Sequence, residues 1–252
     1  MGRSTCTAIA CAIVAGTAHT ARAELLSLSA SRDAAIYESA DGSAANGAGR
    51  YLFAGRNNQN LARRSLIHFE LAGVVPDGAE ITSARLILNL SQGSAGPARE
   101  VRLHRALTAW TTGASDPADP EGSGMEPSPG DATWIHASFA GADGGTLWQH
   151  AGGDFDATAS ASALTGATGL YTWSSNALLA DVRAFLAGSS ANLGWFLVGD
   201  ESAAGTARRF DSADGSAFGG VAPRLEIEFT VVPAPGALGL LAGAALIGRR
   251  RR

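Results

Sequence analysis

The chain lacks lysine entirely, and its only two cysteines, Cys6 and Cys11, lie within the first eleven residues. The rest of the chain therefore has no disulfide, no thiolate metal ligand, no Schiff-base amine and no P-loop lysine. It also has no G-x-S-x-G or H-E-x-x-H motif and no EF-hand loop. These absences exclude a disulfide scaffold and leave no residue set that predicts a catalytic site.

Clustered positive charge is also missing. Residues 24–232 hold 13 arginines against 23 acidic residues, a net charge of −10. Binding to nucleic acid or to an anionic membrane surface requires clustered basic side chains that displace counterions. The acidic body therefore predicts that neither nucleic acid nor anionic lipid is a partner.

The N-terminus contains a short apolar run, from Thr7 to about Ala18, after the basic residue Arg3. A membrane anchor is the alternative interpretation, but a spanning helix needs ~20 apolar residues. The run leads to Ala21-Arg22-Ala23, the A-x-A pattern of a signal-peptide cleavage site. We therefore predict a signal peptide over residues 1–23, cleavage after Ala23 and export of the protein.

The C-terminus contains a second short apolar run, Gly236–Gly248, between two prolines and four arginines. A helix of this length reaches only ~20 Å, against a hydrocarbon core of ~30 Å. The arginines fix the orientation of such a segment, because positive charge stays on the cytoplasmic side of a membrane. An ordinary C-terminal anchor is the alternative interpretation. The flanking residues are Pro233, Pro235, Arg249, Arg250, Arg251 and Arg252.

This Pro-x-Pro, apolar run and basic terminus, residues 233–252, resemble the PEP-CTERM sorting signal of Gram-negative bacteria. One position departs from that signal, because Ala234 stands where a glutamate is usual. The resemblance implies recognition by an exosortase-type membrane protease, transient anchoring in the inner membrane and removal of the tail. The protein would then be released or transferred to the cell surface or the extracellular matrix.

Apolar residues alternate with polar ones along several short stretches of residues 24–232, which is the period of half-buried strands. These stretches are 67–71, 86–90, 101–103 and 225–231. The stretch Leu193–Val198 is apolar on both faces, which places it centrally in a sheet. Clusters of Gly, Asp, Asn and Ser between the stretches indicate turns. The pattern predicts an all-β fold, a single jelly-roll-like β-sandwich domain over residues 24–232.

One short helix interrupts this pattern. Helical spacing places Leu178, Leu179, Val182, Phe185 and Leu186 on one face, with Ser174, Ser175 or Asn176 as the N-cap and Gly188 as the stop. Residues 115–130 contain four prolines and cannot form a regular element. A domain linker is one interpretation of that segment, and we favour a long loop within one domain.

The body also resembles a second family, the DNRLRE (disaggregatase-related) domains, over about residues 30–230. The segment Ser65–Leu71, followed by Pro76 and Ile81–Leu86, is similar to the core of these domains, although the hexapeptide that names the family is absent. Further matches are Trp110 and residues 130–134, 152–155, 192–195, 208–212 and 223–225. The resemblance implies a jelly-roll sandwich of surface proteins, related in shape to carbohydrate-binding modules, and no catalysis.

Aromatic and histidine side chains are the first candidates for a site. Trp110, Trp148 and Trp173 flank polar, glycine-rich loops, where an exposed ring can stack on a sugar, and burial is the alternative. We place Trp134 and Trp195 in the core. His68 and His104 occupy outward strand positions without metal-ligand spacing, so we expect both to be solvated.

Calcium is the only metal or cofactor that the sequence suggests. Asp33, Asn57, Asp211 and Asp214 lie near predicted strand ends and offer the oxygen ligands that structural Ca²⁺ prefers. The alternative is that all four are ordinary turn-forming residues, because no local motif joins them.

Three functions are compatible with these observations. The first is an exported, exosortase-sorted structural or adhesive protein of the cell surface or exopolysaccharide matrix. The second is a carbohydrate-binding module with exopolysaccharide as partner. The third is a glycan-degrading enzyme, which would need two carboxylates ~5–9.5 Å apart, a separation that sequence does not reveal.

Overall fold

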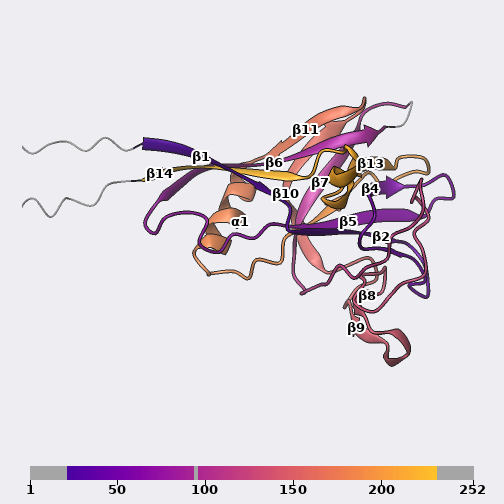
Figure 1. Ribbon diagram of the computed structural model, residues 1–252. Coiled ribbons are helices and arrows are strands. Elements are labelled where there is room, and N and C mark those ends of the chain that lie inside the picture. The colour runs from indigo at the N-terminus through magenta and orange to yellow at the C-terminus, as the bar shows by residue number, and fades with distance from the viewer. Residues whose placement is uncertain (1–21, 94–95, 232–252) are drawn as a thin grey trace, which may run out of the picture.

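The computed structural model describes residues 22–93 and 96–231 and confirms an all-β sandwich with one α-helix in these ranges (Figure 1). Ala21, Pro233, Pro235 and Arg249–Arg252 lie outside the described residues. The elements are β1 (Arg22–Ser29), β2 (Arg32–Tyr37), β3 (Ala45–Asn46), β4 (Tyr51–Arg56), β5 (Ala62–His68), β6 (Glu80–Gln92), β7 (Arg99–Ala106), β8 (His136–Phe139), η1 (Gly141–Asp143), β9 (Gly145–Leu147), β10 (Phe155–Thr165), β11 (Gly169–Ser174), α1 (Asn176–Leu186), β12 (Trp195–Val198), β13 (Arg208–Asp211), η2 (Asp214–Phe218) and β14 (Arg224–Val231).

Antiparallel pairing joins the main strands in the order β1-β14-β6-β13-β4-β5-β12-β7-β10, with β11 on β6 and with β2 on β5 and β3. This path curls into two facing sheets. The first sheet contains β1, β14, β6, β11, β13 and β4, and the second contains β3, β2, β5, β12, β7 and β10. Strand β4 joins them, because its first four residues pair with β13 and its last two pair with β5.

The main core fills the space between the two sheets, as the alternation predicts. Leu86, Leu88 and Leu90 of β6 point inward and are almost completely buried, and Trp173 and Trp195 pack in the same cluster. Burial of such large side chains contributes about 1.5–3 kcal/mol each. The inward residues of each strand therefore supply one continuous apolar layer.

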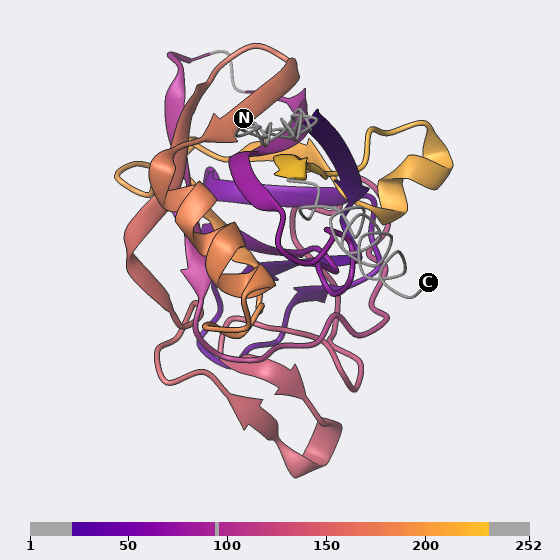
Figure 2. The ribbon, with the colours of Figure 1, turned by 90° about the vertical axis from the view of Figure 1, so that its left-hand side faces the viewer.

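Helix α1 covers one end of this core, as Figure 2 shows. Leu178, Val182 and Phe185 are its buried residues. Ser175 caps the N-terminus, because its Oγ accepts hydrogen bonds from the N–H groups of Ala177 and Leu178. Gly188 follows the last turn with φ of 65°, a conformation that suits glycine at a helix end. The predicted helix, its cap and its stop are confirmed.

Loops cover the outer face of the second sheet. Residues 107–154 contain only the short β8–β9 hairpin as a strand pair, and they pack Trp110, Trp134 and Trp148 against Phe196 of β12. We call this segment the loop layer. Strand β12 is therefore central and buried on both faces, as predicted.

The prediction that His68 and His104 are solvated is wrong. Both are buried, and desolvation lowers the pKa of each imidazole. The Nδ1 atom of His68 lies 2.7 Å from Ser31 Oγ, and that of His104 lies 2.8 Å from the carbonyl oxygen of Asp156 in β10. Alternation could not show that segments distant in sequence pack against these two side chains.

Buried carboxylates bind backbone N–H groups of the loops. Asp131 accepts from Ser115 N and Ser128 N at 3.2 and 2.6 Å. Asp154 accepts from Gln149 N and His150 N at 2.8 and 2.9 Å. Such charge-assisted bonds satisfy donors that have no strand partner. The predicted long loop is confirmed, and these acids explain how it is held.

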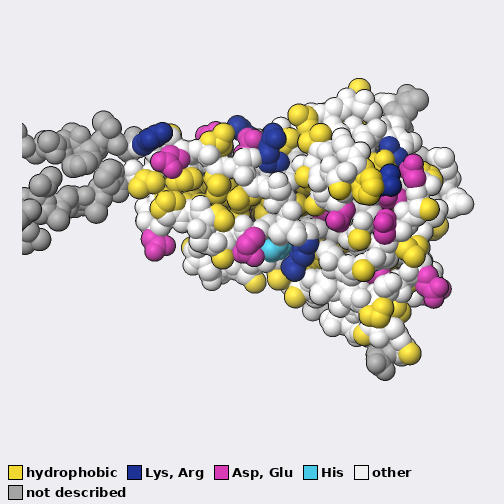
Figure 3. Space-filling view, in the orientation of Figure 1, with side chains coloured by type: hydrophobic (Ala, Val, Ile, Leu, Met, Phe, Trp, Pro, Cys, Tyr) yellow, Lys and Arg dark blue, Asp and Glu magenta, His cyan; other side chains and the backbone are white. Residues whose placement is uncertain are grey.

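The two ends of the described chain lie side by side. Arg22 of β1 pairs with Val231 of β14, so the flanking segments leave the sandwich at one end. Apolar side chains gather at this end on the face that Figure 3 shows, and Leu25 is 57% exposed. Strand β1 includes Arg22 and Ala23, which the predicted cleavage would remove.

Among the described residues, no helix has the length and apolar character needed to cross a bilayer.

Candidate binding site

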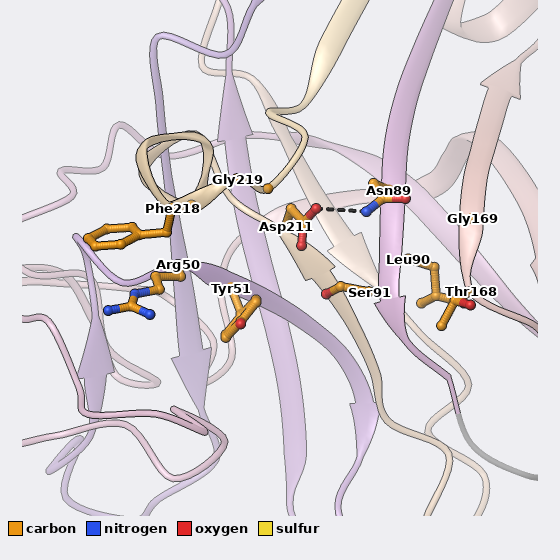
Figure 4. Close-up of a pocket in the computed structure, with 12 residues that line it drawn as sticks. Arg50, Tyr51, Asn89, Leu90, Ser91, Thr168, Gly169, Asp211, Phe218 and Gly219 are labelled. Carbon is orange, nitrogen blue, oxygen red and sulfur yellow. Dashed lines mark hydrogen bonds between the residues drawn. The ribbon is translucent and has the colours of Figure 1, made fainter.

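A pocket of about 590 Å³ lies on the outer face of the first sheet, and none of its lining residues comes from the loop layer (Figure 4). Outward side chains of β4, β6 and β13 form its floor, and η2 and the turn before β11 form its walls. These strands place alternate residues outward because the inward ones belong to the main core.

An amide and a carboxylate form the polar floor of the pocket. Asn89 Nδ2 donates to Asp211 Oδ2 at 2.7 Å, and the N–H of Val221 donates to the same oxygen at 2.8 Å. No hydrogen bond to Asp211 Oδ1 occurs within the described ranges. Asp211 is therefore held rigidly by one oxygen and can accept a ligand hydroxyl at the other.

An exposed aromatic ring stands at one wall. Phe218 ends η2, and 64% of its surface is exposed. The guanidinium carbon of Arg50 lies 3.8 Å from the centre of its ring. Gly219 follows in the left-handed conformation with φ of 87°, which turns the chain back toward β14. The wall thus presents an apolar face and a cation together.

A second stacked pair separates this pocket from a neighbouring hollow of about 380 Å³. The guanidinium carbon of Arg209 lies 3.8 Å from the ring centre of Tyr51. Tyr51 lines the pocket and Arg209 lines the neighbouring hollow, which also contains Asn58 and Gln92. We call the two hollows together the outer groove.

Buried hydrogen bonds fix the backbone under the outer groove. Glu121 Oε1 and Oε2 accept from Arg50 N and Tyr51 N at 3.0 and 3.1 Å. Ser212 Oγ donates to the carbonyl oxygen of Gly49 at 2.7 Å. The β4 wall is therefore preorganised by residues that do not themselves line the pocket.

Asp33 supports the start of η2 from inside the sandwich. Its Oδ2 accepts from Ala213 N at 2.8 Å, one residue before η2 begins. Burial raises the pKa of Asp33 to about 7; the hydrogen bond from Ala213 opposes this shift, and the charge of Asp214 adds to it. Burial also raises the pKa of Asp214, with a further contribution from Asp116.

The three tryptophans predicted as stacking surfaces are all buried, so that prediction is wrong. Trp110, Trp148 and Trp173 are 2%, 6% and 0% exposed. Each indole N–H donates to a backbone carbonyl oxygen, at Leu193, Thr133 and Val101 respectively. Trp110 and Trp148 pack in the loop layer, and Trp173 packs between the two sheets. The core positions of Trp134 and Trp195 are confirmed.

The four predicted calcium ligands have separate roles in the structure. Asp33 supports η2, Asp211 lines the pocket, and Asn57 Oδ1 accepts from Gln59 N and Leu61 N in the β4–β5 turn. Asp214 is near Asp33, but in the part of the chain that the structure describes no three His, Cys, Asp or Glu side chains form a metal-binding group. Calcium stays a prediction.

A larger hollow of about 760 Å³ lies between α1 and residues 70–81. Two of its carboxylates, Glu70 and Asp77, lie in the segment before β6, and the third, Glu80, begins β6. The aromatic ring in its lining, Phe185, is 7% exposed. This hollow offers no free aromatic face, so the outer groove is the better candidate site.

Two of the residues predicted from the sequence, Asp211 and Asn57, line the outer groove, and both were predicted as calcium ligands. Alternation did place Asn89 outward, which was the available signal. Arg50 and Phe218 lie outside the strands, where periodicity carries no information. No family model matches the chain, and no curated protein matches it.

Proposed function

We propose that the chain is an exported, non-catalytic protein of the cell surface or exopolysaccharide matrix, and that it binds polysaccharide in the outer groove. The observation that carries this proposal is the Asn89–Asp211 pair lying in a pocket beside the exposed ring of Phe218. The two terminal signals support export and sorting by an exosortase-type protease, with transient anchoring in the membrane.

Sugars offer hydroxyl groups around an apolar ring face, and the groove supplies partners for both. Asp211 Oδ1 and Asn89 Oδ1 can accept hydroxyl hydrogens, while Phe218 can pack against C–H groups. Groups fixed before the ligand arrives lose little conformational freedom on binding. Asp211 and the backbone of Arg50 and Tyr51 are fixed in this way.

Binding is favoured over cleavage by the number of acids in the pocket. Asp211 is the single carboxylate in its lining. Both retaining and inverting glycosidases use two carboxylates that flank the bond to be cleaved. A glycan-degrading activity would thus need a second acid that this pocket does not supply.

Affinity electrophoresis of the purified protein through gels containing neutral and acidic polysaccharides, with and without calcium, tests the binding. We expect retardation by a subset of them and weaker retardation of Phe218→Ala. Leu147→Ala is the control, because Leu147 is 60% exposed on the β8–β9 hairpin, away from the groove. No retardation by any polysaccharide, or equal retardation of both variants, would overturn the proposed site.

Cell fractionation tests the export. An immunoblot should find the protein outside the cytoplasm and shorter than the full chain. Full-length protein confined to the cytoplasm would contradict the proposed location.

A further inference from the structure

Two arginines of the outer groove differ from most others in having no acidic partner. Among the described residues, seven arginines form ion pairs with acidic side chains, and both charges are interspersed on the face shown in Figure 3. Three more, Arg63, Arg183 and Arg208, donate to backbone carbonyl oxygens. Within residues 22–93 and 96–231, Arg50 and Arg209 have neither a side-chain hydrogen bond nor an ion pair. Arg22 and Arg32 have neither in these ranges, but Arg22 is exposed at the start of β1, Arg32 stacks on buried Trp110, and neither lines the groove.

Stacking fixes both guanidinium groups without neutralising them. Arg50 lies over Phe218 and Arg209 over Tyr51, each at 3.8 Å from the ring centre. A stacked guanidinium keeps its N–H donors in the plane of the fork, where a carboxylate accepts two of them.

The two arginines line two neighbouring hollows. Arg50 lines the pocket of about 590 Å³, which Tyr51 also lines, and Arg209, which stacks on Tyr51, lines the hollow of about 380 Å³. The fold creates this pair, because the residues are far apart in sequence while β4 and β13 are paired. A polymer that lies across both hollows can reach both guanidinium groups.

We infer that the ligand of the outer groove is an acidic polysaccharide whose carboxylates pair with Arg50 and Arg209. This inference rests on the proposed function and adds the class of ligand. Asp211 accepts hydrogen bonds from Asn89 and Val221 at Oδ2, which leaves Oδ1 to accept ligand hydroxyl groups, so the ligand carboxylates point to the arginines and away from this acid. The rest of the acidic body repels polyanions, so affinity depends on these two arginines.

The test compares polygalacturonate with its methyl-esterified form, which has the same sugar backbone without the charge. Biolayer interferometry with the purified protein should show at least tenfold tighter binding to the charged polymer. We expect Arg50→Gln and Arg209→Gln each to weaken that binding about tenfold or more, and added salt to weaken it further. Arg209→Lys should bind the charged polymer about as weakly as Arg209→Gln does, because lysine keeps the charge but lacks the planar set of N–H donors that pairs with a carboxylate.

Arg102→Gln is the matched control, because Arg102 is an exposed arginine on β7 of the other sheet. It should bind as the unaltered protein does, and thermal melting should show that all variants fold. Equal binding to both polymers, or charged-polymer binding unchanged in Arg50→Gln and Arg209→Gln, overturns this inference and leaves the proposed function standing. Binding to neutral glycans alone also overturns the inference and leaves the proposed function standing. Failure to bind any glycan overturns the inference and the proposed function together.

Discussion

The main core and the loop layer are two ways of filling space on opposite faces of the same strands. Between the sheets, inward apolar residues meet without any local polar partner, as Leu88 and Leu103 do. In the loop layer, apolar residues such as Trp148 share the interior with the carboxylates of Asp131 and Asp154. Strands satisfy their own backbone groups, whereas loops need side chains to do so.

The comparison teaches that buried acids in this molecule are a consequence of irregular backbone. Each carboxylate replaces the carbonyl acceptors that a neighbouring strand would supply. Stability should therefore depend on shape in the main core and on hydrogen bonds in the loop layer. Four substitutions test this difference.

Trp173→Ala should have the largest effect. Trp173 is fully buried between the sheets, where its ring packs against Phe210 at 5.9 Å and its N–H bonds to Val101. The cavity and the lost hydrogen bond should lower the free energy of unfolding by about 3–5 kcal/mol. Denaturant unfolding measures it, and a loss below about 1 kcal/mol would contradict the role assigned to the main core.

Asp33→Asn should stabilise the protein at pH 8. Asp33 is a buried acid with one backbone donor and no neutralising cation in the described ranges, and its pKa is raised to about 7. The folded form holds this proton more tightly than the unfolded form does. The stability that protonation provides is complete below about pH 4 and is lost as the pH rises to about 7.

At pH 8 the charge should cost about 2–4 kcal/mol, which asparagine avoids while its Oδ1 still accepts from Ala213. Thermal melting of both proteins from pH 4.5 to 8.5 measures the difference, which should grow with pH. Equal melting temperatures across that range would show that the buried charge of Asp33 does not destabilise the fold.

Asp131→Asn, in the loop layer, should destabilise the protein, whereas Asp33→Asn stabilises it. Asp131 accepts from two backbone N–H groups, and asparagine replaces one acceptor oxygen with a donor. We expect a loss of about 1–3 kcal/mol. Hydrogen exchange should show that the loop layer opens while the main-core strands stay protected. Uniform loss of protection would show that the two regions unfold together, which contradicts the difference between them.

Phe218→Ala should have the smallest effect on stability, within about 0.5 kcal/mol, because the ring is 64% exposed. Its melting temperature should equal that of the Leu147→Ala control. A large loss would make Phe218 part of the folding core and weaken its assignment to the groove.

The main core was predictable because its signal is local. Alternation along β6 and β14 and the helical spacing of Leu178 and Val182 depend on neighbours in sequence. The burial of Trp148 and His104 was not predictable, because the residues that cover them, such as Phe196 and Asp156, are far away in the chain. The outer groove was not predictable from the sequence for the same reason, since the β4–β13 pairing brings the regions of Arg50 and Arg209 together.

The position of β14 also determines how the sandwich bears mechanical load. Strand β14 lies between β1 and β6, paired with each along most of its length. A pull on the chain beyond Val231, resisted by a ligand in the groove, acts along the strand and stresses all these pairs at once, in shear. A pull that separates both chain ends would instead open the β1–β14 pairs one at a time, starting at the end where the chain leaves the sandwich. The fold therefore holds firmly against a tether at the C-terminal end alone.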